Sequence, residues 1–89
     1  MGITVIVSDQ VADFDDWKAM FDGDADKREN ADIHAIPYKQ LDDPNHAHVI
    51  ATAPSREAFD RFFSQPELQQ RIQDSGVLGP PEICFWEEA

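Results

Sequence analysis

The apolar positions along the chain have the spacing and composition of β-strands in four segments. Residues 3–8 and 82–86 are the first and the last of these segments. Between them, residues 34–52 hold two more apolar segments, joined at residues 42–45 by an Asp-Asp-Pro-Asn sequence that favours a turn. We therefore predict two outer strands and, between them in the sequence, a β-hairpin over residues 34–52.

Two segments between these strands carry apolar residues at helical spacing. The first helix is predicted to begin after Asp13, a good N-cap, and to end near Asn30, with a kink or fraying at Gly23. The second is predicted to begin after Ser55 and to restart at residues 64–67, whose Ser-Gln-Pro-Glu sequence has the pattern of a capping box. The apolar series are Phe14, Trp17 and Phe21 in the first helix, and Phe59, Phe62, Phe63, Leu68 and Ile72 in the second.

The order strand-helix-strand-strand-helix-strand (β-α-β-β-α-β) is that of an α+β, ferredoxin-like sandwich. It fills the chain, so we predict a single domain over residues 1–89. In this plan the antiparallel four-stranded sheet has the order 4-1-3-2, which makes the second strand, residues 33–41, an edge strand. Pro37 agrees with that place, because proline cannot donate a hydrogen bond to a neighbouring strand.

Both faces of the predicted sheet are apolar. Val5 and Val7 point to one face and Ile6 to the other, and Val49 and Ile50 are likewise neighbours on opposite faces. Two helices can cover only one face. A homodimer that pairs sheet against sheet is the simplest cover for the second face, and a monomer with an apolar groove is the alternative.

The net charge of the chain limits the classes of molecule that it is expected to bind. With 18 acidic and 7 basic residues, the net charge of -11 disfavours binding to nucleic acid and to anionic membrane surfaces. The single cysteine, Cys84, cannot form an internal disulfide and is predicted to pack inside its apolar strand. No signal peptide or membrane span is visible in the sequence, so a cytoplasmic location is expected.

One acidic segment, residues 22–29, superficially has the pattern of a calcium loop. Lys27 stands where such a loop needs glycine, and Ile33 stands where it needs its last glutamate. We therefore interpret the segment as the acidic outer face of a helix. His46 and His48 share one face of a strand, but a metal site needs a third ligand, and His34 lies several positions away along the hairpin. We therefore predict no metal site within one chain, and a site shared across a dimer is the alternative.

Four segments of the chain carry a resemblance to a known superfamily. They are the helix start at residues 11–17, the turn at 42–45, the helical phrase at 64–68 and the ending at 76–83. Together they resemble the dimeric α+β barrel superfamily, which includes antibiotic-biosynthesis monooxygenase-like domains. The resemblance implies that two ferredoxin-like chains pack their sheets together, with a pocket between each sheet and its own helices.

Members of this superfamily include cofactor-free oxygenases, haem degraders, polyketide cyclases and lactone isomerases. Haem degraders have a histidine on the second helix, and residues 56–74 contain none. The resemblance therefore implies no cofactor and favours an apolar small molecule as the ligand.

Three side chains are our candidates for catalysis: His34, Tyr38 and His48. A neutral imidazole can remove a proton from a phenol or an activated carbon, and Tyr38 can orient an oxygen of the same ligand. The candidate ligand-binding residues are aromatic, although aromatic residues at helical spacing also build cores. They are Trp17, Phe21, Phe59, Phe63 and Trp86.

Two functions follow from these patterns. The first is a small cofactor-independent enzyme, of the monooxygenase, cyclase or isomerase type, that acts on an apolar cyclic molecule in a pocket between sheet and helices. The second is a non-catalytic, ligand-binding or accessory homodimer, which the absence of a convincing acid–base pair favours.

Overall fold

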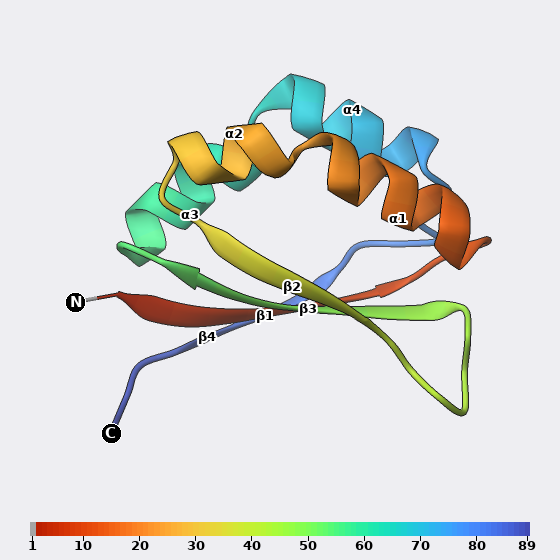
Figure 1. Cartoon of the computed structure of the whole chain (residues 1–89), viewed down its shortest axis with the longest axis horizontal. Coiled ribbons are helices and arrows are strands. Elements are labelled where there is room, and N and C mark those ends of the chain that lie inside the picture. The colour runs from red at the N-terminus through yellow and green to blue at the C-terminus, as the bar shows by residue number, and fades with distance from the viewer. Residues whose placement is uncertain (1) are drawn as a thin grey trace.

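A computed structural model of the chain describes residues 2–89. It contains four strands and four helices (Figure 1). In chain order these are β1 (Ile3–Gln10), α1 (Phe14–Gly23), α2 (Ala25–Asn30), β2 (His34–Lys39), β3 (His46–Ala53), α3 (Arg56–Phe63), α4 (Pro66–Asp74) and β4 (Glu82–Trp86).

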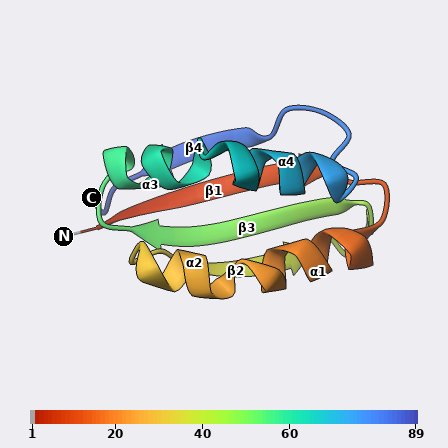
Figure 2. The same cartoon turned by 90° about the horizontal axis from the view of Figure 1, so that it is seen from above.

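The four strands form one antiparallel sheet in the order β2-β3-β1-β4, which confirms the predicted ferredoxin-like topology. Strand β2, which contains Pro37, is an edge strand as predicted. All four helices lie on one face of the sheet, and the other face carries none (Figure 1). Seen from above, α1 and α2 run along the β2 side, and α3 and α4 run along the β4 side (Figure 2).

Both helical segments are interrupted, and their caps explain where each part begins. The Asp13 carboxylate accepts a hydrogen bond from the backbone N–H of Asp16, and the Ser55 hydroxyl accepts one from Ala58, so both predicted N-caps are confirmed. The predicted break near Gly23 is also confirmed, since α1 ends there and α2 begins two residues later.

The predicted capping box at residues 64–67 is wrong. Gln65, not Ser64, occupies the N-cap position of α4, and its side chain makes no capping hydrogen bond. The physical reason is that Ser64 ends α3, where its backbone N–H donates to the carbonyl of Asp60. Pro66 starts α4 instead, in a position where its missing N–H has no helical partner to lose.

The two faces of the sheet differ because side chains alternate along each strand. Val5, Val7, Val49 and Ala51 face the helices and are buried in the core. The opposite face, which we call the outer face, presents one apolar row across all four strands. This row consists of the register partners Ile36, Ile50, Ile6 and Cys84.

Cys84 is exposed, so the prediction that it packs inside its strand is wrong for the single chain. Its neighbours Ile83 and Phe85 take the two inward positions of β4, which leaves Cys84 on the outer face. Within residues 2–89, none of the helices combines the length and the apolar character needed to cross a membrane.

Candidate functional site

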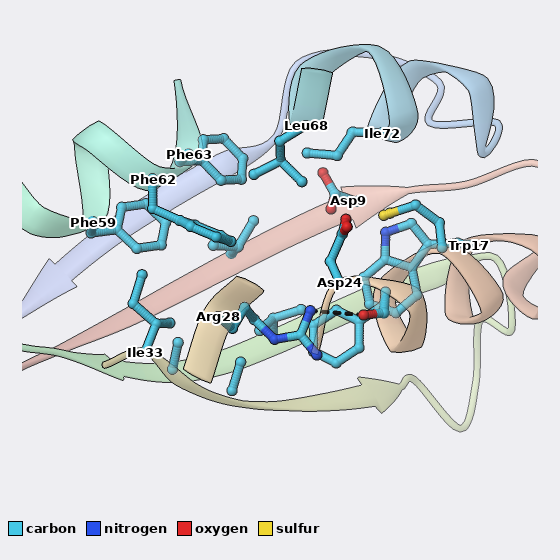
Figure 3. A pocket seen from close by; sticks show the side chains of 16 residues that line it. Asp9, Trp17, Asp24, Arg28, Ile33, Phe59, Phe62, Phe63, Leu68 and Ile72 are labelled. Atoms are coloured by element: carbon cyan, nitrogen blue, oxygen red, sulfur yellow. Dashed lines mark hydrogen bonds between the residues drawn. The ribbon is translucent and has the colours of Figure 1, made fainter. Parts of the chain in front are cut away.

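The candidate site is a pocket between the sheet and the helices (Figure 3). It encloses a cavity of about 70 Å³. Its floor is the inner face of the sheet and its roof is built from all four helices. Trp17 and the carboxylates of Asp9 and Asp24 lie together at one end, and Phe59 and Phe63 lie toward the other (Figure 3). The pocket is therefore an apolar chamber with its polar groups gathered on one side.

Asp9 is a buried acid on β1. It continues the inward series of Val5 and Val7, two positions further along the strand, and its side chain faces the helices for that reason. The residue is 7% exposed, and within residues 2–89 its Oδ1 atom has no hydrogen-bond partner. Burial raises the pKa of Asp9 from 3.8 to about 6, although the positive charge of His46 acts in the opposite direction.

Asp24, at the break between α1 and α2, is even more deeply buried and is 3% exposed. Its carboxylate is paired: Arg71 Nε lies 3.1 Å from Oδ1 and 3.2 Å from Oδ2, and Lys27 Nζ lies 3.8 Å from Oδ1. The prediction that residues 22–29 form an acidic outer face is therefore wrong at this position. The interruption of the helix after Gly23 places Asp24 beside Arg71 of α4.

Arg28 supplies a cation to the same pocket. Its guanidinium lies 3.7 Å above the ring of Phe21, and Nη1 donates a 2.7 Å hydrogen bond to the carbonyl of Phe21. Burial lowers the pKa of Arg28, and the nearby carboxylates of Asp24 and Asp22 oppose that shift. The pocket is thus lined both by an acid that can exchange a proton, Asp9, and by a cation that is held in place, Arg28.

Four of the five predicted ligand-binding aromatic residues line this pocket: Trp17, Phe21, Phe59 and Phe63. Trp17 stacks on Phe21 with ring centroids 5.3 Å apart, and Phe59 stacks on Phe63 at the same distance. Trp86 does not line the pocket. It stands on the outer face, 56% exposed, because the residues that β4 turns inward are its neighbours.

The three predicted catalytic residues, His34, Tyr38 and His48, are not in the pocket. The expectation that they line it is wrong, because strand alternation turns all three to the outer face. Tyr38 and His48 are cross-strand partners there, and the hydroxyl Oγ of Ser8 lies 3.0 Å from His48 Nδ1. A catalytic role for these residues stays a prediction.

Sequence reasoning missed the three polar residues that do line the pocket: Asp9, Asp24 and Arg28. For Asp9 a signal was present, because the alternation that turns Val5 and Val7 inward continues to it. For Asp24 and Arg28 no comparable signal existed, since both depend on where the helix breaks. Within residues 2–89, no three His, Cys, Asp or Glu side chains converge in a way that could hold a metal ion.

Comparison with known proteins gives similarity in structure alone. The sequence matches no known protein family and no curated protein. An antibiotic biosynthesis monooxygenase-like protein from Bordetella bronchiseptica superposes with a TM-score of 0.83 at 14% identity, over 99% of this chain and 97% of that one.

Two other solved structures agree with this match. SnoaB from Streptomyces nogalater, a cofactor-independent oxygenase, has a TM-score of 0.80 at 15% identity, with 99% and 93% covered. A conserved protein from Methanosarcina mazei has a TM-score of 0.80 at 12% identity, with 100% and 94% covered. The chain has the ferredoxin-like fold of the antibiotic biosynthesis monooxygenase-like proteins.

Proposed function

We propose that this protein is a homodimeric, cofactor-independent enzyme of the monooxygenase type, which binds an apolar cyclic molecule in the pocket between sheet and helices. The observation that carries the proposal is Asp9. An acid with an unpaired oxygen in an apolar chamber is placed to accept a proton from a bound molecule. The fold similarity to a cofactor-independent oxygenase supports the same reaction type.

The chemistry begins with proton transfer to Asp9. With a pKa of about 6, its carboxyl group is mostly ionised at pH 7 and still basic enough to accept a proton from a phenol or an activated methylene. Arg28, which lines the same pocket, provides the positive charge that stabilises the substrate anion.

In the oxygenase reaction the substrate carbanion donates electrons to O2, the co-substrate and oxidant. One oxygen atom ends in a new carbonyl group at the former methylene carbon. The other leaves as water, with the two protons of that carbon, one of them returned by Asp9. The substrate thus supplies both electron pairs, and no reductant is required.

The homodimer is proposed to form through the outer faces of the two sheets. Four large hydrophobic side chains stand exposed there: Ile36, Tyr38, Ile50 and Trp86. An exposed apolar face of this kind favours a partner, and a second copy is the simplest one. In this arrangement His34 and His48 lie at the interface between the sheets. A cytoplasmic location is part of this proposal, in keeping with the single cysteine of the chain.

The test uses 1,8-dihydroxyanthrone, a flat phenol with an acidic methylene group. Under nitrogen in D2O, the wild-type protein is expected to accelerate exchange of the methylene protons, followed by NMR. Asp9→Asn should lower that rate by about 100-fold or more, the usual contribution of a general base. Asp26→Asn is the matched control, because Asp26 is an exposed residue of α2 and the substitution removes the same charge.

The same experiment in air follows O2 uptake, and one O2 is expected for each molecule of quinone formed. An Asp9→Asn variant that exchanges protons at the wild-type rate would contradict the role of Asp9. A wild-type protein that binds the anthrone without exchanging its protons would instead favour the non-catalytic, ligand-binding homodimer.

A further inference from the structure

The pocket is too small for the ligand that the proposed function requires. Its cavity of about 70 Å³ is about half the size of an engineered protein cavity, of roughly 150 Å³, that binds a single benzene ring. A cyclic substrate can therefore bind only if part of the roof moves. The inference below rests on the proposed function and concerns how the pocket is reached.

The roof consists of two halves that lie side by side with a seam between them. One half is α1 with α2, and the other is α3 with α4 (Figure 2). A second hollow, which we call the seam groove, lies between α1–α2 and α4 and is lined by residues of both halves, among them Lys27 and Arg71. Met20 and Asp24 line both the seam groove and the pocket. These two side chains therefore separate the seam groove from the pocket.

One ion pair joins the two halves across this seam. Asp24 lies at the break between α1 and α2, and Arg71 lies on α4, 47 residues away. Among the side-chain hydrogen bonds and ion pairs of residues 2–89, this is the one that connects α1–α2 with α3–α4. The Asp24 side chain is 4% exposed and that of Arg71 is 36% exposed. Solvent therefore reaches the ion pair mainly at Arg71.

Because Asp24 lies at the break between α1 and α2, its ion pair with Arg71 can affect how these helices are placed relative to α4. The helix is interrupted there, so α1 and α2 are held together across this residue by the contact of Arg28 with Phe21 and not by a continuous ladder of helical hydrogen bonds. Separating Asp24 from Arg71 would open the floor of the seam groove into the pocket.

We propose that the seam groove is the access route to the pocket and that Asp24 and Arg71 form its latch. The latch holds the roof closed over the free pocket, opens for exchange, and forms again over a bound ligand once the apolar side chains of the roof have moved to make room for it. Because the pair is made in both closed states, it governs the rates of binding and release and not the affinity. Uncharged ligands are favoured over anions, since the groove holds Asp16, Asp24 and Asp74 against Lys27 and Arg71.

The test measures exchange of N-phenyl-1-naphthylamine, an uncharged fluorescent ring compound, by stopped-flow fluorescence. Arg71→Gln is expected to raise both the association and the dissociation rate by about tenfold, with Kd unchanged within about twofold. Arg61→Gln removes the same charge from an exposed position of α3 and should leave both rates unchanged. Arg71→Lys, which keeps the charge, should lie between Arg71→Gln and the wild type.

The wild-type protein provides a second measurement, which does not depend on the folding of a variant. Raising NaCl from about 50 mM to about 1 M screens a partly exposed ion pair, and it should accelerate exchange toward the rate of Arg71→Gln. Ala51→Leu, which fills the pocket from its floor, should abolish binding.

Failure of the latch and failure of the proposed pocket give different results. Wild-type rates in Arg71→Gln, or an exchange rate of the wild type that does not respond to salt, would overturn the latch while the pocket stands. Binding that survives Ala51→Leu with wild-type rates would show that the probe binds outside this pocket, and would overturn the pocket as the binding site. Absence of binding in the wild type would overturn the pocket itself, and with it the latch.

Discussion

Ser8 and His48 lie directly opposite each other on β1 and β3, and Ser8 Oγ is 3.0 Å from His48 Nδ1 on the outer face of the sheet. The next residue along β1, Asp9, points to the other side and into the pocket. One step along a strand thus separates a polar contact on the proposed dimer face from the acid of the proposed active site.

Asp9 is expected to make the stability of the protein fall as the pH rises. Its pKa is about 6 in the folded chain against 3.8 ordinarily, so the folded state holds this proton more tightly than the unfolded state. The stabilisation is complete below about pH 4 and is lost as the pH rises through about 6. Relative to wild type, Asp9→Asn should therefore gain about 2–3 kcal/mol in free energy of unfolding between pH 4 and pH 7.

Urea unfolding at a series of pH values measures this difference. Asp26→Asn, at an exposed position, serves as the control and should show no such pH-dependent gain. If the difference between Asp9→Asn and wild type stays constant from pH 4 to pH 7, the raised pKa is refuted.

The catalytic rate should show the opposite trend with pH. Asp9 accepts a proton only when it is ionised, so kcat/KM for 1,8-dihydroxyanthrone should rise tenfold per pH unit well below pH 6 and level off above it. Rates of methylene exchange in buffers from pH 4.5 to about 8 give this profile. A rate that is constant across pH 6 would exclude Asp9 as the base.

Placing a charge in the apolar row of the outer face should dissociate the proposed homodimer. Ile50 is 40% exposed within that row, and Ile50→Asp is expected to convert the proposed dimer into a monomer in analytical ultracentrifugation. Burying an unpaired charge in an apolar interface is strongly unfavourable. Gln73→Asp adds the same charge to an exposed position of α4 and should leave the dimer intact.

Cys84 gives an independent measure of the same interface. It belongs to the apolar row, so its thiol should react slowly with 5,5′-dithiobis(2-nitrobenzoate) in the dimer and rapidly in Ile50→Asp. Equal reaction rates in both proteins would show that the outer face is not the contact surface.

The two tryptophans should differ sharply in their contribution to stability. Trp17 is 2% exposed and packs between Phe14 and Phe21, and truncating it to alanine should lower the free energy of unfolding by about 3–5 kcal/mol. Trp86 is 56% exposed, so Trp86→Ala should change stability by less than about 1 kcal/mol in the Ile50→Asp background, which is expected to be monomeric. Chemical denaturation of both variants in the Ile50→Asp background measures the two changes in free energy of unfolding.

The two serines that precede α3 and α4 should also differ. Ser55→Ala removes the side chain that caps α3 and should destabilise the protein by about 1 kcal/mol. Ser64→Ala removes no capping hydrogen bond, because Gln65 is the N-cap of α4, and should be nearly neutral. Thermal unfolding compares them, and a loss at Ser64 equal to that at Ser55 would restore the capping box.

Much of the fold could be predicted because it depends on local features. Period-two segments specified the strands, and β4 runs over Glu82–Trp86 as predicted. Asp13 and Ser55 marked the starts of α1 and α3, since a side chain that caps a helix acts on residues two or three positions away. Pro37 indicated the edge of the sheet for an equally local reason.

The candidate site depended on contacts between distant residues, and there local patterns were insufficient. The sequence by itself determined which residues share a strand face, so the common face of His34 and Tyr38 was readable from it. Only the tertiary structure decided that the helices cover the other face, which leaves these residues outside the pocket and encloses Asp9. The pairing of Asp24 with Arg71 could not be predicted from the sequence either. It requires two residues 47 positions apart, one at the break between α1 and α2 and one on α4, to come into contact.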